Sequence, residues 1–202
     1  ESNRPVPTEL SVPLVIYAES GSGKSSLLAY WAEQFRRRHP DALVVEHYVG
    51  IGAVDVDHLG VIRHVMMELK EHYQIPQEIP QRPEELESEF ANWLAFLPGD
   101  NGTGGESAPT LVLIIDGINQ LTGSGLSLSW IPEFIPSHVR LIVSSTVEET
   151  LVQLRSRGWH QIGMQPLAEK EREAVIVRFL SEFHKALSVN QIARIAADQK
   201  SS

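Results

Sequence analysis

The sequence contains no cysteine. Disulfide bonds and thiolate chemistry are therefore excluded, and a zinc site would have to use histidines and carboxylates alone. The histidines do not show the close spacing of a zinc-binding motif. We expect His58, His64 and His72 to lie on helix surfaces.

Long apolar runs are also missing. A membrane-spanning helix needs about 20 apolar residues, whereas the longest runs, 14–18 and 111–115, are only strand-sized. The first residues are polar and include prolines, without the basic and then apolar segments of a signal peptide. We therefore expect a cytoplasmic protein with no membrane partner.

Positive charge is in short supply, because the net charge is −9. Neutralisation of phosphates supplies much of the affinity for nucleic acids, so this balance argues against a nucleic-acid partner. One basic run, Arg36–Arg38 followed by His39, has a simpler explanation. Cations at the C-terminal end of a helix complement its dipole.

Short apolar runs alternate with segments of helical periodicity, which is typical of a parallel α/β sheet. The expected strands cover 13–18, 42–49, 111–115, 139–143 and 159–164. The expected helices cover 27–35, 61–73, 84–97, 146–157, 169–187 and 189–197. The Gly-rich segment 98–109 is expected to be a surface loop.

This order predicts a three-layer α/β/α sandwich with a mostly parallel five-stranded sheet. Only helices follow the last strand, so we expect a core at 1–165 and the beginning of a helical lid at 166–202. No stop signal follows the last expected helix. We therefore expect the sequence to be a piece of a longer protein.

Residues 18–25, AESGSGKS, match the Walker A phosphate-binding pattern with Ala18 in place of its first glycine. The segment stands between an expected strand and an expected helix, which is the context that this motif requires. Lys24 should reach the β- and γ-phosphates, and the Ser25 hydroxyl should bind Mg²⁺. The residues expected to hold nucleotide are Glu19, Ser20, Gly21, Ser22, Gly23, Lys24, Ser25 and Ser26.

Two other interpretations of glycine-rich segments are weaker. A chance Gly/Ser-rich turn would not explain why strand, turn, lysine, serine and helix all agree. A dinucleotide-binding turn would need glycine or alanine where Ser26 stands, and it would not place Lys24 within the turn. The pair Gly50 and Gly52 indicates only a turn.

Asp116 ends the apolar run 111–116, LVLIID, which matches the Walker B pattern. A buried strand would carry it to the carboxyl edge of the sheet, beside the phosphate loop, where it would bind Mg²⁺ directly or through water. A capping role in the following turn is compatible with this one.

The segment 116–121, DGINQL, looks like the extended Walker B segment of the STAND class of P-loop ATPases, which includes NACHT domains. Residues 128–132 (LSWIP) and 139–144 (VRLIVS) resemble nephrocystin-3-type NACHT proteins with tetratricopeptide or WD repeats. Tyr30-Trp31 and 47–50 (HYVG) fit the same group, and the resemblance covers the chain from about Pro13 onward.

The resemblance implies a regulated switch that holds ATP or ADP with Mg²⁺ between the core and a helical lid. Such proteins change shape or form homo-oligomers on nucleotide exchange, and they often hydrolyse ATP slowly. Residues 167–172 resemble the start of the lid, and the adenine contact would fall just past Ser202. The implied partners are other domains of the same protein, including a repeat region.

The match departs from many NACHT domains at Asn119-Gln120, where those have Asp-Glu. Lys24, Asp116, Asn119 and Gln120 are the candidate catalytic residues. Amides orient a water by hydrogen bonds but cannot take its proton, so we expect slow or absent hydrolysis. Glu46 is a second candidate base, although a solvated strand residue explains it more simply.

The segment after the fourth expected strand leaves two interpretations open. Ser145 is a candidate γ-phosphate sensor or a helix N-cap. Thr146 with Glu149 fits a capping box.

Three functions remain. The leading one is an ATP-dependent switch with weak ATPase activity, and the second is a scaffold that binds ATP without hydrolysis. A P-loop kinase would need a basic lid, for which Arg155 and Arg157 are weak candidates that a solvated helix end explains more simply. The Asn-Lys-x-Asp guanine signature and the Gly-x-Ser-x-Gly hydrolase elbow are both absent.

Overall fold

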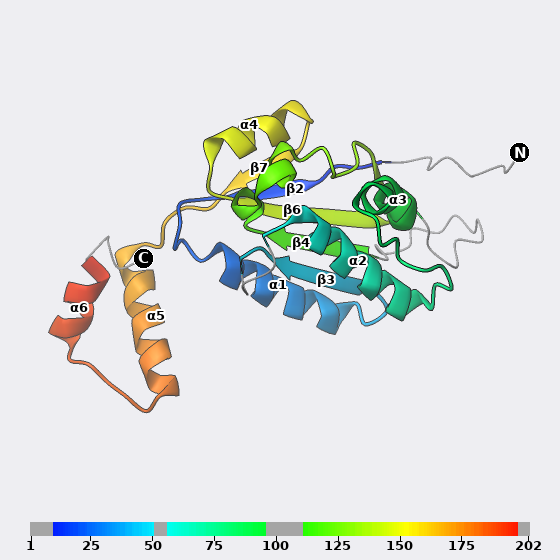
Figure 1. Ribbon diagram of the computed structural model, residues 1–202. Helices are drawn as coiled ribbons and strands as arrows, with labels where there is room; N and C mark the ends of the chain where they lie inside the picture. The colour runs from blue at the N-terminus through cyan, green and yellow to red at the C-terminus, as the bar shows by residue number, and fades with distance from the viewer. Residues whose placement is uncertain (1–9, 51–55, 96–110, 198–202) are drawn as a thin grey trace, which may run out of the picture.

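The computed structural model describes residues 10–50, 56–95 and 111–197 (Figure 1). A parallel five-stranded sheet with the order β3-β4-β6-β2-β7 forms its centre. Its strands are β2 (Leu14–Tyr17), β3 (Leu43–Tyr48), β4 (Leu111–Asp116), β6 (Val139–Ser145) and β7 (His160–Gly163). A small antiparallel sheet joins β1 (Leu10–Ser11) to β5 (Ile135–Pro136).

Helices cover both faces of the large sheet. The helices are α1 (Lys24–Arg38), α2 (His58–Tyr73), α3 (Pro83–Ala95), α4 (Glu148–Ser156), α5 (Glu169–Glu182) and α6 (Val189–Ala197). Two 3₁₀ turns, η1 (Ile118–Gln120) and η2 (Gly123–Ser127), follow β4. One core cluster joins α1 to one face of the sheet, and the other joins α2, α3 and α4 to the opposite face. The predicted three-layer α/β/α sandwich is confirmed.

The central strand shows why the sequence folds in this way. Every residue of β4 is buried, because β3 and β6 flank it and helices cover both of its faces. A strand in this environment reads as a continuous apolar run, which is the pattern seen at 111–115. The apolar run thus places Asp116 at the carboxyl edge of the sheet.

Several predicted helix bounds are wrong. α1 and α2 each begin three residues earlier than periodicity indicated, at Lys24 and His58. The side chain of Asp57 caps α2 by accepting from the backbone N–H of Leu59 at 3.2 Å. α5 ends at Glu182 rather than at 187. The chain turns just after the helix, with a positive φ of 54° at His184. The loop predicted at 98–109 and the predicted end of α3 at 96–97 lie outside the described residues.

The capping box predicted for Thr146 and Glu149 is also wrong. Val147 is the N-cap of α4, and no side chain caps this helix. The backbone N–H of Thr146 instead donates to the side-chain oxygen of Asn119 at 3.0 Å. The start of α4 is therefore fixed by a contact to η1, which no local sequence pattern encodes.

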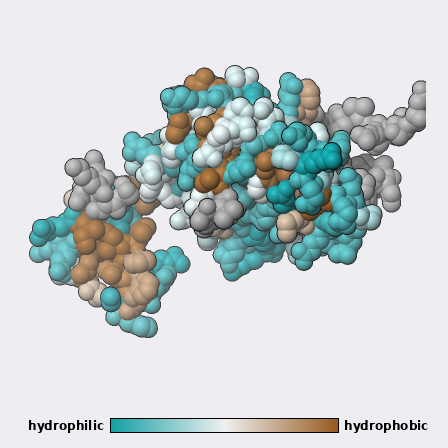
Figure 2. Space-filling model, viewed as in Figure 1, coloured by the Kyte–Doolittle hydropathy of each residue, from teal (hydrophilic) through white to brown (hydrophobic). Residues whose placement is uncertain are grey.

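The last two helices pack mainly against each other and stand to one side of the sandwich (Figure 1). α5 buries none of its residues, and Ala196 is the one buried residue of α6. Figure 2 shows apolar surface on the visible face of this helix pair. Among the described helices, none has the length and apolar character needed to cross a membrane.

Candidate functional site

A cavity of about 320 Å³ opens at the carboxyl edge of the sheet, beside the N-terminus of α1. Open α/β sheets bind their ligands at this edge. Its lining residues come from the 18–26 segment and from the ends of β4 and β6: Ser20, Gly21, Gly23, Lys24, Ser25, Ser26, Asp116, Gly117, Asn119, Gln120, Ser144 and Thr146. Most of the residues predicted to bind nucleotide therefore line one cavity; Glu19 and Ser22 belong to the same loop but do not line it.

The 18–25 loop wraps around the ammonium group of Lys24. The Lys24 Nζ donates to the carbonyls of Ala18 at 3.0 Å and Glu19 at 2.8 Å, and to the Ser22 hydroxyl at 3.3 Å. Gly23 adopts a φ of 88° at the N-cap of α1, a conformation that favours glycine. Burial lowers the pKa of Lys24, and the nearby charge of Asp116 opposes part of that shift. The loop thus holds a cation next to the free N–H groups of a helix N-terminus, which is a favourable place for an anion.

Asp116 joins this loop to the neighbouring strand. The hydroxyls of Ser25 and Ser144 both donate hydrogen bonds to its carboxylate. Ser144 in turn accepts a hydrogen bond from the backbone N–H of Gly117 at 2.8 Å. The two predicted Mg²⁺ ligands, Ser25 and Asp116, are therefore in direct contact across α1 and β4.

Ser144, and not Ser145, is the β6 serine that lines the cavity. Ser145 is fully buried and accepts from the backbone N–H of Val147 at 3.2 Å, so its hydroxyl acts locally. The sequence does contain a signal for Ser144, because side chains alternate between the two faces of the sheet along β6. Ile142 packs on the α1 side of the sheet and pairs with Ile114 of β4. Ser144 lies two residues later, so it is expected on the same side, next to Asp116.

The two amide side chains after Asp116, Asn119 and Gln120, have different surroundings. Asn119 is held by the backbone N–H of Thr146. Gln120 is exposed, and its carboxamide lies beside Gly50 and Gly117. Both side chains line the cavity.

The residues present fit a divalent cation that shares its coordination with water and a ligand. Within 10–50, 56–95 and 111–197, no group of three or more His, Cys, Asp or Glu could enclose a metal ion. Mg²⁺ commonly keeps several waters and takes only one or two protein carboxylates, with phosphate oxygens completing its shell. Ser25 and Asp116 are in contact and would supply the two protein oxygens of such a site.

Glu46 does not behave as the solvated residue that we predicted. Its carboxylate lies 2.5 Å from an Arg36 guanidinium nitrogen and accepts a hydrogen bond from the Tyr48 hydroxyl at 2.5 Å. Burial and the Glu46 carboxylate raise the pKa of Tyr48. Glu46 does not line the cavity, so it is a poor candidate for a base there.

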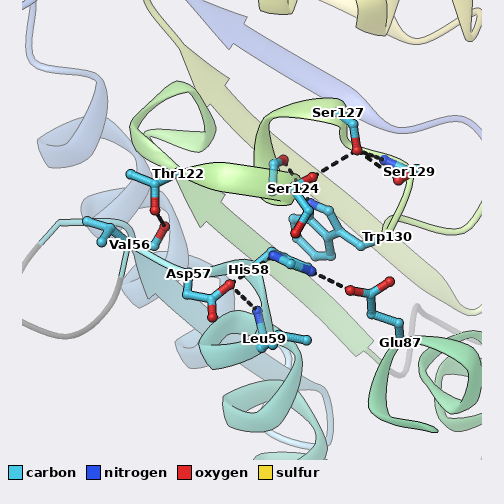
Figure 3. A network of polar contacts seen from close by, with 11 residues as sticks. Val56, Asp57, His58, Leu59, Glu87, Thr122, Ser124, Ser127, Ser129 and Trp130 are labelled. Atoms are coloured by element: carbon cyan, nitrogen blue, oxygen red, sulfur yellow. Dashed lines mark hydrogen bonds and ion pairs between the residues drawn. The ribbon is translucent and has the colours of Figure 1, made fainter. Parts of the chain in front are cut away.

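His58 is buried and does not lie on a helix surface as predicted. Its Nε2 lies 2.6 Å from a Glu87 carboxylate oxygen on α3, and its ring lies 5.8 Å from the ring of Trp130 (Figure 3). Thr122 donates its backbone N–H to the carbonyl of Val56 at 2.9 Å. These contacts anchor the segment that follows Asp116 to the N-termini of α2 and α3.

Arg157 is likewise not a solvated helix end. Its guanidinium donates to the carbonyls of Leu128 at 3.0 Å and Ile131 at 2.6 Å, and it lies 5.3 Å from the Trp159 ring centroid. Burial lowers its pKa, an effect that the charge of Glu133 partly offsets. The side chain fixes the 128–131 segment to α4 and is not available to close over a second substrate.

The sequence has recognisable relatives, although no family model matches it. It is 29% identical over 224 residues to a TPR repeat-containing protein of Dictyostelium discoideum, covering 93% of this chain and 13% of that protein. It is 34% identical over 152 residues to tetratricopeptide repeat protein 41 of Rattus norvegicus, covering 69% of this chain and 11% of that protein. Nephrocystin-3 of Mus musculus is 27% identical over 165 residues, covering 81% of this chain and 12% of that protein. The chain thus spans between 11% and 13% of the length of these relatives.

Solved structures agree on the architecture. A point mutant of RuvB from Thermotoga maritima matches 96% of this chain and 52% of its own, with a TM-score of 0.52 and 15% sequence identity. A second mutant of the same protein gives a TM-score of 0.51. The chain has the α/β fold of a P-loop NTPase. At this identity the likeness concerns the fold alone, so the chemistry of the cavity has to be argued from its own residues.

Proposed function

We propose that this chain is an ATP- and Mg²⁺-binding switch domain of a STAND-type regulatory protein, and that it hydrolyses ATP slowly. The observation that carries the proposal is the contact of Ser25 with Asp116 beside Lys24, in one cavity at the carboxyl edge of the sheet. A phosphate-binding loop, a cation and two magnesium-type ligands are what a nucleoside triphosphate requires.

The residues would act together on the phosphates. The N–H groups of the 20–26 segment and the α1 N-terminus would bind phosphate oxygens. Lys24 would exchange its contacts with the Ala18 and Glu19 carbonyls for the β- and γ-phosphates. Ser25 and Asp116 would hold Mg²⁺, which neutralises charge on the phosphates.

The expected rate of hydrolysis follows from what lines the cavity. Asp116 is the one carboxylate among the described lining residues, and two serine hydroxyls already donate to it. Asn119 is engaged by Thr146, which leaves the Gln120 amide to orient a water. An amide cannot take a proton, so slow turnover is expected and complete loss of hydrolysis is the closest alternative. Arg157 is engaged by backbone carbonyls, which weakens the kinase alternative.

The relatives support a place within a larger protein. Their printed names describe tetratricopeptide-repeat proteins and nephrocystin-3, and each is several times longer than the matched part. We propose that residues 1–165 form the core and that 166–202 begin a helical lid, which the separate position of α5 and α6 supports (Figure 1). Nucleotide-dependent association with other domains or with a second copy, in the cytoplasm, belongs to the same proposal.

Calorimetric titration with ATP, ADP and GTP, with and without Mg²⁺, tests this function. Phosphate release should be measured on the same sample. The expected result is selective binding of adenine nucleotides, strengthened by Mg²⁺, with little phosphate release. Equal affinity for GTP would contradict the adenine assignment. Fast phosphate release would contradict the expected slow hydrolysis.

A further inference from the structure

Gln120 lies in a seat formed by two glycines at the ends of neighbouring strands. Gly50 follows β3, and Gly117 follows β4 directly. A Cβ atom on Gly50 would lie 2.7 Å from the Gln120 Oε1, and one on Gly117 would lie 2.5 Å from its Nε2. Both distances are too short for real contacts, so neither position can carry a side chain while the carboxamide stays where it is.

Two hydrogen bonds hold the backbone beside this seat. The Gln120 N–H donates to the Gly117 carbonyl at 2.8 Å, which closes the η1 turn. The Val49 N–H donates to the Asp116 carbonyl at 3.0 Å, which ties the end of β3 to the end of β4. Gly50 and Gly117 have φ angles of 86° and 73°, in the left-handed region that favours glycine. The seat is thus defined by backbone that is anchored independently of the Gln120 side chain.

We propose that Gly50 is a positioning residue for ATP hydrolysis, because it leaves room for the Gln120 carboxamide at the edge of the phosphate cavity. This inference rests on the proposed function. Gln120 lines the cavity, and its amide can both donate to and accept from a water. Gly50 does not line the cavity, so it acts on the reaction only through Gln120.

In the step concerned, the oxygen of a water held by Gln120 forms a bond to the γ-phosphorus. The bond between that phosphorus and the oxygen bridging the β- and γ-phosphates breaks, and its electron pair leaves with ADP. Since an amide cannot accept the proton, the proton of the attacking water passes to the released phosphate. Gln120 therefore contributes orientation alone, and a displaced carboxamide should lower the rate without lowering nucleotide affinity.

Gly50→Ala tests this role, with Gly158→Ala as its matched control. Gly158 also has a positive φ, 75°, but a Cβ there meets no atom within 4 Å. Both substitutions carry the same type of backbone strain, and only the first displaces Gln120. We expect Gly50→Ala to lower single-turnover phosphate release by about tenfold or more, with the Kd for ATP almost unchanged. Gly158→Ala should change neither the release rate nor the Kd when both are compared at the same fraction of folded protein.

The pair Gly50 and Gln120 should also be tested together. Gln120→Ala should slow release to a similar degree, and Gly50→Ala should add nothing in that background. A full additional loss in the double variant would overturn the proposal, as would normal release by Gly50→Ala. Nucleotide binding without any phosphate release by the unmodified chain would also overturn it while leaving the binding function intact. If the unmodified chain did not bind ATP at all, the proposed function itself would be contradicted.

Discussion

The hydroxyl of Ser144, on β6, donates a hydrogen bond to the carboxylate of Asp116 on the adjacent strand β4. The same hydroxyl accepts from the backbone N–H of Gly117. Ser144 is fully buried, and its hydroxyl links the carboxylate, which Ser25 also contacts, to the start of the turn that carries Asn119 and Gln120.

Replacing Ser144 with alanine should therefore weaken magnesium-dependent binding. The Gly117 N–H would lose its partner, which should cost about 1–3 kcal/mol of unfolding free energy. We expect the affinity for ATP with Mg²⁺ to fall by about tenfold, or about 1.4 kcal/mol, and the Mg²⁺-free affinity to change little. Titration calorimetry measures both, and Ser145→Ala is the control, since Ser145 is equally buried but bonds to Val147. Equal losses with and without Mg²⁺ would contradict the role of Ser144.

Asp116→Asn separates the metal contact from the rest of the site. The substitution keeps the size of the side chain and removes the charge that a divalent cation needs. Binding of ATP with Mg²⁺ should weaken strongly, whereas Mg²⁺-free binding should be retained. A loss of the same size under both conditions would count against Asp116 as a metal ligand.

Sequence patterns were enough to predict the sandwich and the two loops that meet at the cavity. The apolar run of β4 and the glycines before Lys24 are local signals, and parallel strands place their carboxyl ends together. The contact of Ser25 with Asp116 follows from that topology. Local signals were thus enough to bring Ser25 and Asp116 together at one cavity.

Contacts between distant segments were not predictable in the same way. The role of Ser144 depends on the register between β4 and β6, and the burial of His58 depends on Glu87 and Trp130. Gly50 resembled an ordinary turn residue, because its contact with Gln120 joins segments 70 positions apart. Such pairings are set by the packing of the whole sandwich, which no short window of sequence contains.

Introducing carboxylates at the amide pair should speed hydrolysis. Asn119→Asp combined with Gln120→Glu supplies a group that can take the proton of the attacking water. A carboxylate oxygen in place of the Asn119 amide oxygen could still accept from the Thr146 N–H, so the turn should be kept. We expect faster steady-state phosphate release, whereas Gln120→Asn, which adds no base and shortens the side chain, should give no increase. An unchanged rate would mean that proton transfer to a side chain at this place does not limit turnover.

Glu46 should prove structural. Its carboxylate is held by Arg36 and Tyr48, away from the cavity. Glu46→Gln should lower the unfolding free energy by about 1–2 kcal/mol, as measured by urea denaturation, with ATP turnover unchanged at a matched folded fraction. A large loss of turnover with intact binding would show that Glu46 acts as the base.

Arg157 is expected to stabilise the fold through the 128–131 segment. Arg157→Ala removes two charge-assisted hydrogen bonds to the Leu128 and Ile131 carbonyls and should cost about 2–4 kcal/mol. Arg155→Ala is the matched control, because that side chain is mostly exposed and should matter by at most about 0.5 kcal/mol. Equal unfolding midpoints for the two variants in urea would contradict the anchoring role.

The most direct test of nucleotide binding in this cavity compares Lys24→Ala with Lys70→Ala. Lys24 lines the cavity, whereas Lys70 lies on α2 beside Glu78. The affinity of each variant for ATP with Mg²⁺ should be measured by titration calorimetry against the unmodified chain. We predict that Lys24→Ala abolishes detectable binding and that Lys70→Ala retains it. Unchanged affinity in Lys24→Ala would contradict the assignment of the 18–25 loop to phosphate binding, and with it the proposed function.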